Sequence, residues 1–149
     1  SAVIERFYDR YADVVNRRHP IETPWAERER ARLREVIAFL YSDPLASVMF
    51  GVLSASPRAA EVEAQRHADM VALSGRNIRD GVERGAIPPN ANPDLAGAAI
   101  LGAVRSAFTF AVRTDVRPST EELAEQLWAV IAGALKLDQH PLLTLEGPA

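Results

Sequence analysis

The pattern of hydrophobic and polar positions divides the chain into helical segments separated by prolines. In residues 2–18 apolar side chains recur at steps of three and four residues, which places them on one face of a helix. Similar stripes begin near residues 24, 44, 57, 95 and 120. No segment alternates β-branched and polar residues as a half-buried strand does. The pattern therefore predicts an all-α protein, folded as an antiparallel helical bundle.

Capping residues and prolines predict where these helices begin and end. A capping side chain precedes a proline at the first helical position in three places, Thr23-Pro24, Asp43-Pro44 and Ser56-Pro57. Ser119 and Glu122 have the spacing of a capping box. Gly85 is expected to end the helix that begins at Pro57, and Asn92 or Asp94 to cap the next one.

The segment 95–112 is apolar on every side of the predicted helix. Its only strongly polar side chains are those of Arg105, Ser106 and Thr109. A helix of this kind must be covered all round. Its length would just permit a membrane span, but Arg105 near the middle and the many alanines and glycines argue against one. We therefore expect other protein segments to bury it on two sides.

The last helix is also apolar over more than one face, so two consecutive helices are more apolar than a monomer needs. Four alanines spaced four residues apart in the first of them form a ladder along which another backbone can approach closely. We expect a homodimer in which these helices meet their copies as a four-helix bundle across a two-fold axis. The predicted interface residues are Ala99, Ala103, Ala107, Ala111, Leu127, Trp128, Ile131 and Leu135.

Composition and charge narrow the class of protein. The chain has 149 residues, the size of one domain, with 17 basic and 20 acidic residues and a net charge of -3. The sequence shows no stripe of basic residues of the kind that a nucleic-acid binder normally carries. The chain has no cysteine, which excludes disulfides and thiolate chemistry and is consistent with a reducing compartment. Without a signal-peptide pattern at the start, a cytoplasmic location is the simplest interpretation, and the excess of arginine over lysine suggests a bacterial source.

One stretch, ERERARLRE at 27–35, concentrates arginines that could bind phosphate. Glutamates are interleaved with them, and Glu27 with Arg30 or Glu29 with Arg32 have the i,i+3 spacing of helix ion pairs. We therefore expect a solvated helix face here.

The sequence contains no clear catalytic or metal-binding motif. Glu63 and His67 are four residues apart on one helix, but two further ligands at a recognisable spacing are missing, so no metal or cofactor is predicted. Ser74 lacks a glycine-flanked elbow, which makes it a poor candidate nucleophile.

Arg105 is the most informative single residue, because an arginine on an apolar helix is costly to bury unpaired. It is expected either to pair with Glu63 or Asp69, to lie at the edge of the dimer, or to orient a polar ligand in a pocket. Aromatic and methionine side chains around it would make a largely apolar cavity with a few polar groups, which is typical of a small-molecule site. The candidate ligand-binding residues are Tyr11, Phe39, Met49, Phe50, His67, Met70, Ser74, Arg105 and Phe108.

Residues 1–137 resemble the C-terminal regulatory domain of the TetR family of bacterial transcriptional regulators. The resemblance lies in a long amphipathic helix ending at Gly85, the loop GAIPPNANPDLAGAAI at 85–100, and a last helix opened by Pro118-Ser119-Thr120-Glu121-Glu122. It implies that the last two long helices make the dimer and that the earlier ones enclose a small-molecule pocket. The family's N-terminal helix-turn-helix domain has no counterpart in this sequence, so the chain is either a fragment of a longer regulator or an orphan domain. We favour the fragment, with 138–149 as a C-terminal tail.

Three functions remain open at this stage. The first is an effector-sensing and dimerisation domain that controls, through a small and largely apolar ligand, how a missing N-terminal domain binds operator DNA. The second is a small all-α enzyme that uses Glu63, His67 and Arg105 as acid, base and anchor. The third is a pure dimerisation domain with a filled core. We favour the first, which is not an enzyme.

Overall fold

A computed structural model shows an all-helical bundle and describes residues 2–51 and 56–137. Over these residues the elements are α1 (Ala2–Val15), α2 (Trp25–Ser42), α3 (Ala46–Gly51), α4 (Pro57–Glu83), α5 (Pro93–Arg113) and α6 (Thr120–Ala134). The predicted fold class is confirmed. The prediction for the tail, 138–149, falls outside the described residues.

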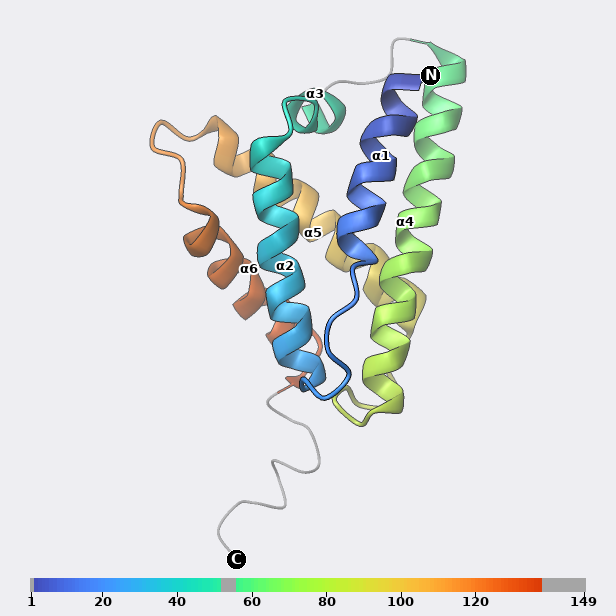
Figure 1. The fold of residues 1–149 in the computed structure, drawn as a ribbon, viewed down its shortest axis with the longest axis vertical. Coiled ribbons are helices and arrows are strands. Elements are labelled where there is room, and N and C mark those ends of the chain that lie inside the picture. Colours follow the sequence, from blue (N-terminus) through green and yellow to red (C-terminus); the bar gives the residue numbers. More distant parts are fainter. Residues whose placement is uncertain (1, 52–55, 138–149) are drawn as a thin grey trace, which may run out of the picture.

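Three long helices run side by side, and two more cover one flank. Figure 1 shows α1 between α2 and α4, with α5 crossing behind them and α6 beside α2. The start of α1, the short α3 and the start of α4 share one end of the bundle. The α1–α2 and α4–α5 connections share the other end.

Local capping explains the starts of α4, α5 and α6. The side chains of Ser56, Asn92 and Ser119 each accept a hydrogen bond from the backbone N–H three residues later, at 3.2, 3.1 and 3.1 Å. Gly85 follows α4 with a φ of 79°, the left-handed conformation that glycine adopts without strain. These four predictions are confirmed.

Two predicted boundaries are wrong. Pro24, rather than Thr23, is the residue before α2, and no side chain caps that end. The first helix ends at Val15 rather than at residue 18, because the chain turns there toward the 16–24 connection. The carbonyl groups of Val15 and Arg17 accept hydrogen bonds from Arg32 of α2 at 2.6 and 2.7 Å, which stabilises this early turn.

The closest helix crossing joins α4 to α5. A Cβ added to Gly97 would lie 2.7 Å from the backbone nitrogen of Gly75, so only glycine permits this approach. Nearby, a Cβ on Gly81 would lie 2.7 Å from the ring of Trp25. The crossing fixes α5 against α4 and leaves the opposite side of α5 turned away from the bundle.

Aromatic side chains fill the part of the core between α1, α2 and α5 that lies toward the N-terminal end of the bundle. Phe7, Tyr8 and Tyr11 of α1 are almost fully buried. The ring of Phe7 lies 5.8 Å from that of Phe39, and the ring of Phe50 lies 5.9 Å from that of Phe108. These edge-on and tilted contacts are the geometries that aromatic pairs prefer.

Candidate functional site

An apolar cavity of about 70 Å³ lies inside the bundle, where five helices meet. Its walls include Tyr11 and Val15 of α1, Leu33 and Val36 of α2, and Ile78 of α4. From α5 come Ile100, Leu101 and Val104, from α6 come Trp128 and Ile131, and Leu135 follows directly after α6. A few polar groups border it, namely Glu29, Arg32, Ser74 and Asn77. This composition is typical of a small-molecule site, although the volume is below the several hundred Å³ of an occupied one.

A smaller cleft of about 10 Å³ lies between α1, α4 and α5. Tyr11 and Leu101 border both this cleft and the cavity. The remaining lining residues of the cleft are Tyr8, Phe50, His67, Met70 and Arg105. The cleft is close to the lower limit of size for a single water molecule.

The structure divides the predicted ligand-binding residues into three groups. Tyr11 and Ser74 line the cavity. Four others line the small cleft together with Tyr11; they are Phe50, His67, Met70 and Arg105. The remaining three, Phe39, Met49 and Phe108, pack in the hydrophobic core and border neither space. Contact between any of them and a ligand stays a prediction.

Arg105 is held at the mouth of the small cleft. Its Nη1 lies 3.8 Å from Oε1 of Glu63, one of the two carboxylates that the sequence offered as partners. Its Nη2 donates a long hydrogen bond of 3.5 Å to the carbonyl oxygen of Phe50, and the guanidinium lies 5.1 Å from the centre of the Phe50 ring. The Arg105 side chain is 40% exposed, so the positive charge remains in contact with solvent.

Burial controls the ionisation of the tyrosines beside this cleft. Burial raises the pKa of Tyr8, and the nearby Glu63 carboxylate raises it further, while Arg105 acts in the opposite direction. Burial also raises the pKa of Tyr11, with a smaller contribution from Tyr8. Both phenols are therefore neutral at physiological pH and present hydroxyl groups, not phenolates, to this part of the core.

A network of charged side chains borders the cavity, and it is more buried than the sequence pattern predicts. Arg28, Glu29 and Arg32 were expected on a solvated face, but their side chains are only 10 to 11% exposed, so that expectation is wrong for these three. The expected ion pair between Glu29 and Arg32 is present at 3.0 Å. Arg30 instead pairs with Glu125 of α6.

Asp80 of α4 connects this network to the end of the bundle. Its carboxylate accepts hydrogen bonds from Arg28 and, at 3.1 Å, from Arg84. Burial acts to raise the pKa of Asp80, but the two arginines together outweigh it and hold the pKa below the ordinary value of 3.8. Asp80 and Arg84 have the i,i+4 spacing of a helix ion pair, but the partner Arg28 lies on another helix and could not be predicted from sequence.

The predicted interface residues occupy several different environments. Ala111, Leu127, Ile131 and Leu135 are buried within the protomer, with at most 7% exposure. Trp128 is half-buried and lines the cavity. The other three, Ala99, Ala103 and Ala107, are exposed or half-buried on α5.

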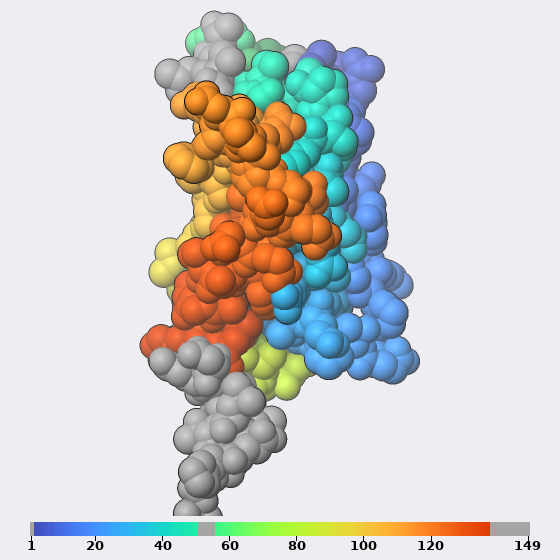
Figure 2. Space-filling view, turned by 90° about the vertical axis from the view of Figure 1, so that its left-hand side faces the viewer, coloured from blue at the N-terminus to red at the C-terminus, as the bar shows by residue number. Residues whose placement is uncertain are grey.

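The outer face of α5 and α6 carries a different set of exposed residues. On α5 they are Leu95, Ala99, Gly102, Ser106 and Phe110, and on α6 they are Ala129, Val130 and Gly133. We call these eight residues the outer face. In Figure 2 both helices lie at the molecular surface on this side. A groove of about 470 Å³ between them is lined by Ala99, Ala103 and Val130, among others.

Two glycines of the outer face have open space where a side chain would project. A Cβ added to Gly102 or Gly133 would meet no atom of the described residues within 4 Å. Glycine in the middle of a helix costs about 1 kcal/mol relative to alanine, so its use at two open positions calls for a reason outside the protomer.

By length and composition, α5 is the one described helix that could cross a membrane. Only 28% of its most apolar 18-residue window is buried within the protomer. The core helices of soluble proteins meet the same criterion of length and composition. The exposed apolar surface of α5 is therefore the feature that any proposed function must explain.

Among the residues that the structure describes, no three His, Asp or Glu side chains gather as metal ligands. Glu63 and His67 lie within one turn of α4, and Arg105 faces them from α5, so the three residues of the enzyme hypothesis are near one another. His67 and Arg105 line the cleft of about 10 Å³, which is too small for a substrate, and Glu63 is not among its lining residues.

Comparison with known proteins gives one informative match. No protein-family model matches the chain, and no curated protein matches it. Among solved structures, the chain is similar to a transcriptional regulator of the TetR/AcrR family from Thermobifida fusca YX-ER1, with a TM-score of 0.62 and 22% sequence identity. The similarity covers 87% of this chain and 67% of that one. The chain therefore shares the helical fold of a TetR/AcrR regulator.

Proposed function

We propose that this chain is the effector-sensing and dimerisation domain of a transcriptional regulator of the TetR type. The fold similarity to a TetR/AcrR regulator supports the general class. In this proposal the domain acts in the bacterial cytoplasm as a homodimer and has no enzymatic activity. Operator DNA is bound by a helix-turn-helix domain outside these 149 residues.

The single observation that carries the proposal is the position of the apolar cavity. The cavity is lined by the inner sides of α5 and α6, through Leu101, Val104 and Ile131 among others. The outer sides of the same two helices carry the exposed apolar residues and the open glycines. A molecule that enlarges the cavity must therefore push on the helices that form the proposed interface.

The second protomer is the occupant that best fits the outer face. Small and glycine residues at Ala99, Gly102 and Gly133 allow the backbones of two helices to approach closely. The groove between α5 and α6 would receive side chains of the symmetry-related pair, as in a four-helix bundle. A two-fold interface needs a self-complementary surface, and an apolar face of small residues is one.

Ligand binding would change the relation of the two protomers by its differential affinity for two dimer arrangements. Coupling of this kind is typically about 1 to 3 kcal/mol, which corresponds to a change in operator affinity of about 5- to 150-fold. The start of α1, the short α3 and the start of α4 lie together at one end of the bundle (Figure 1). A small rotation at α5 and α6 would therefore alter the separation of whatever is joined to the N-terminus.

A distance measurement tests this coupling directly. The chain has no cysteine, so Arg58→Cys at the exposed start of α4 gives one spin-label site per protomer. We expect one sharp distance between the two labels of a dimer, and a shift of several ångströms when an apolar ligand that raises the melting temperature is added. An unchanged distance with a ligand that binds would contradict the allosteric mechanism.

A cavity-filling variant provides the matched control. Ser74 is buried and lines the cavity, and Ser74→Leu would occupy part of its volume. We expect this variant to remain a dimer and to lose the thermal stabilisation by apolar molecules. If no apolar molecule stabilises the wild-type protein, the pure dimerisation domain becomes the better interpretation.

A further inference from the structure

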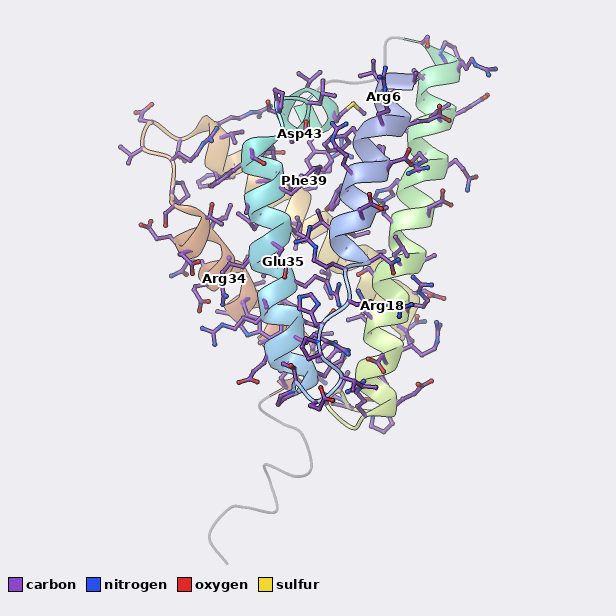
Figure 3. The ribbon with its side chains drawn as sticks, viewed as in Figure 1. Arg6, Arg18, Arg34, Glu35, Phe39 and Asp43 are labelled. Atoms are coloured by element: carbon purple, nitrogen blue, oxygen red, sulfur yellow. The ribbon has the colours of Figure 1, made fainter. Side chains whose placement is uncertain are left out.

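A cleft rich in arginine lies at the end of the bundle away from the N-terminus. Its volume is about 420 Å³, and it lies between the α1–α2 connection, α2 and α4. We call it the arginine cleft, after Arg17, Arg18, Arg28, Arg32 and Arg84 in its walls. Figure 3 labels Arg18, which belongs to the α1–α2 connection, near α4, and Glu35 on α2.

Positive charge exceeds negative charge in this cleft. Asp80 is the one carboxylate among its described lining residues. Two carboxylates that do not line the cleft also pair with these arginines. Oε2 of Glu35 lies 2.8 Å from Nη1 of Arg17, and Oε2 of Glu29 lies 3.0 Å from Nε of Arg32. Five guanidinium groups therefore face three carboxylates.

Two of the arginines keep unused capacity to bind an anion. Arg18 is exposed and makes no ion pair with a described residue. The side chain of Arg28 is only 10% exposed, and its Nε has no hydrogen-bond acceptor among the described residues, although it lies 3.6 Å from Oε2 of Glu29. Buried donors are nearly always satisfied in folded proteins, so an unsatisfied one at a cleft marks a place where a ligand oxygen can bind.

The arginine cleft and the apolar cavity share a wall. Arg32 and Asn77 line both spaces. Beyond this wall the cavity is lined mainly by aliphatic and aromatic side chains, including Leu33, Ile78 and Trp128. One molecule could therefore extend from the charged cleft into the apolar cavity if the side chain of Arg32 moved aside.

We propose that the ligand of this domain is an amphipathic carboxylate, with its apolar body in the cavity and its carboxylate in the arginine cleft. This proposal rests on the proposed function, because it assigns a chemical class to the effector of the same cavity. Arginine binds carboxylate in a bidentate, charge-assisted manner, and an apolar cavity excludes the charged group from its interior. The two neighbouring spaces thus select a molecule with one charged end.

The proposal is tested by comparing three probes at constant ionic strength and pH 7. Octanoate carries both an apolar chain and a carboxylate, octan-1-ol carries the chain alone, and acetate carries the carboxylate alone. Isothermal titration and melting temperature report binding to the full 149-residue chain. We expect octanoate to bind on the order of tenfold more tightly than octan-1-ol, and acetate to give no measurable binding.

Single substitutions locate the binding of the carboxylate. Arg18→Ala is expected to weaken octanoate binding by about threefold and to leave octan-1-ol binding unchanged, and Arg18→Lys to restore part of the loss. Arg6→Ala removes the same charge from the opposite end of α1 and serves as the matched control. It should not affect either probe.

The outcomes separate the two proposals. Equal affinity for octanoate and octan-1-ol would overturn the arginine cleft as the carboxylate site while leaving the effector-sensing function standing. A preference for octanoate that is undiminished in both Arg18→Ala and Arg84→Ala would also overturn it. If neither probe nor any other apolar molecule binds, the effector-sensing function itself is contradicted.

Discussion

The two sides of α5 use glycine and phenylalanine for different purposes. On the inner side, Gly97 lies against Gly75 of α4, and Phe108 is buried in the aromatic core. On the outer side, Gly102 faces open space, and Phe110 is 73% exposed. The inner side is packed within one protomer, whereas the outer side is the proposed interface with a second copy. The same helix thus provides internal controls for any test of the dimer.

The largest expected effect distinguishes the two phenylalanines. Phe108→Ala should lower the free energy of unfolding by about 3 to 5 kcal/mol, because it removes a fully buried ring and leaves a cavity. Phe110→Ala should change the stability of the protomer itself by no more than about 0.5 kcal/mol and should weaken the dimer. Urea unfolding at several protein concentrations separates the two contributions. Equal losses for both variants at every concentration would contradict the distinction.

A smaller effect is expected from the two glycines. In Gly97→Ala the new methyl group would meet the backbone of Gly75, which should cost about 1 to 3 kcal/mol through overpacking. Gly102→Ala is the matched control, since its methyl group meets no atom of the protomer, and the better helix propensity of alanine should leave protomer stability the same or up to about 1 kcal/mol higher. Thermal and urea unfolding measure both changes. A destabilised protomer in Gly102→Ala would show that the outer face is packed from within.

The smallest effect is expected for Asp80 of α4, which pairs with Arg28 and Arg84. Because the folded-state pKa of Asp80 is lowered, its contribution to stability is present above its unfolded pKa near 4 and is lost as pH falls through the folded value. Asp80→Asn should therefore cost about 1 kcal/mol at pH 7, a modest value because the carboxylate is 36% exposed. The difference from wild type should shrink below pH 4. A difference that stays constant between pH 7 and pH 3 would exclude the ion pairs as its cause.

Local hydrogen bonds explain why the starts of α4, α5 and α6 could be predicted from sequence. The caps at Ser56, Asn92 and Ser119 are interactions over three residues, and the turn at Gly85 depends on one backbone conformation. The prediction that Thr23 caps the start of α2 was wrong, because no side chain caps that helix.

The candidate sites could not be predicted fully from sequence periodicity, because they depend on which helices pack against each other. Residues four apart in a helix rotate by about 40° per step, so Ala99 and Ala111 differ by about 120° and lie on opposite sides of the boundary between surface and core. Burial of Arg28 and Arg32 depends on α4 and on the path of the α1–α2 connection, which are distant in sequence. The i,i+3 pattern correctly predicted the Glu29–Arg32 pair but could not show that this pair borders a cavity.

Sedimentation equilibrium tests most directly whether a second copy covers the outer face. At micromolar concentration the wild-type chain should sediment with twice the mass of one protomer. Gly102→Leu, which puts a bulky side chain where the two backbones approach, should raise the dissociation constant by about tenfold or more and keep the helical content of the protomer. A wild-type chain that remains a single protomer at tens of micromolar, with its helices intact, would contradict the proposed interface.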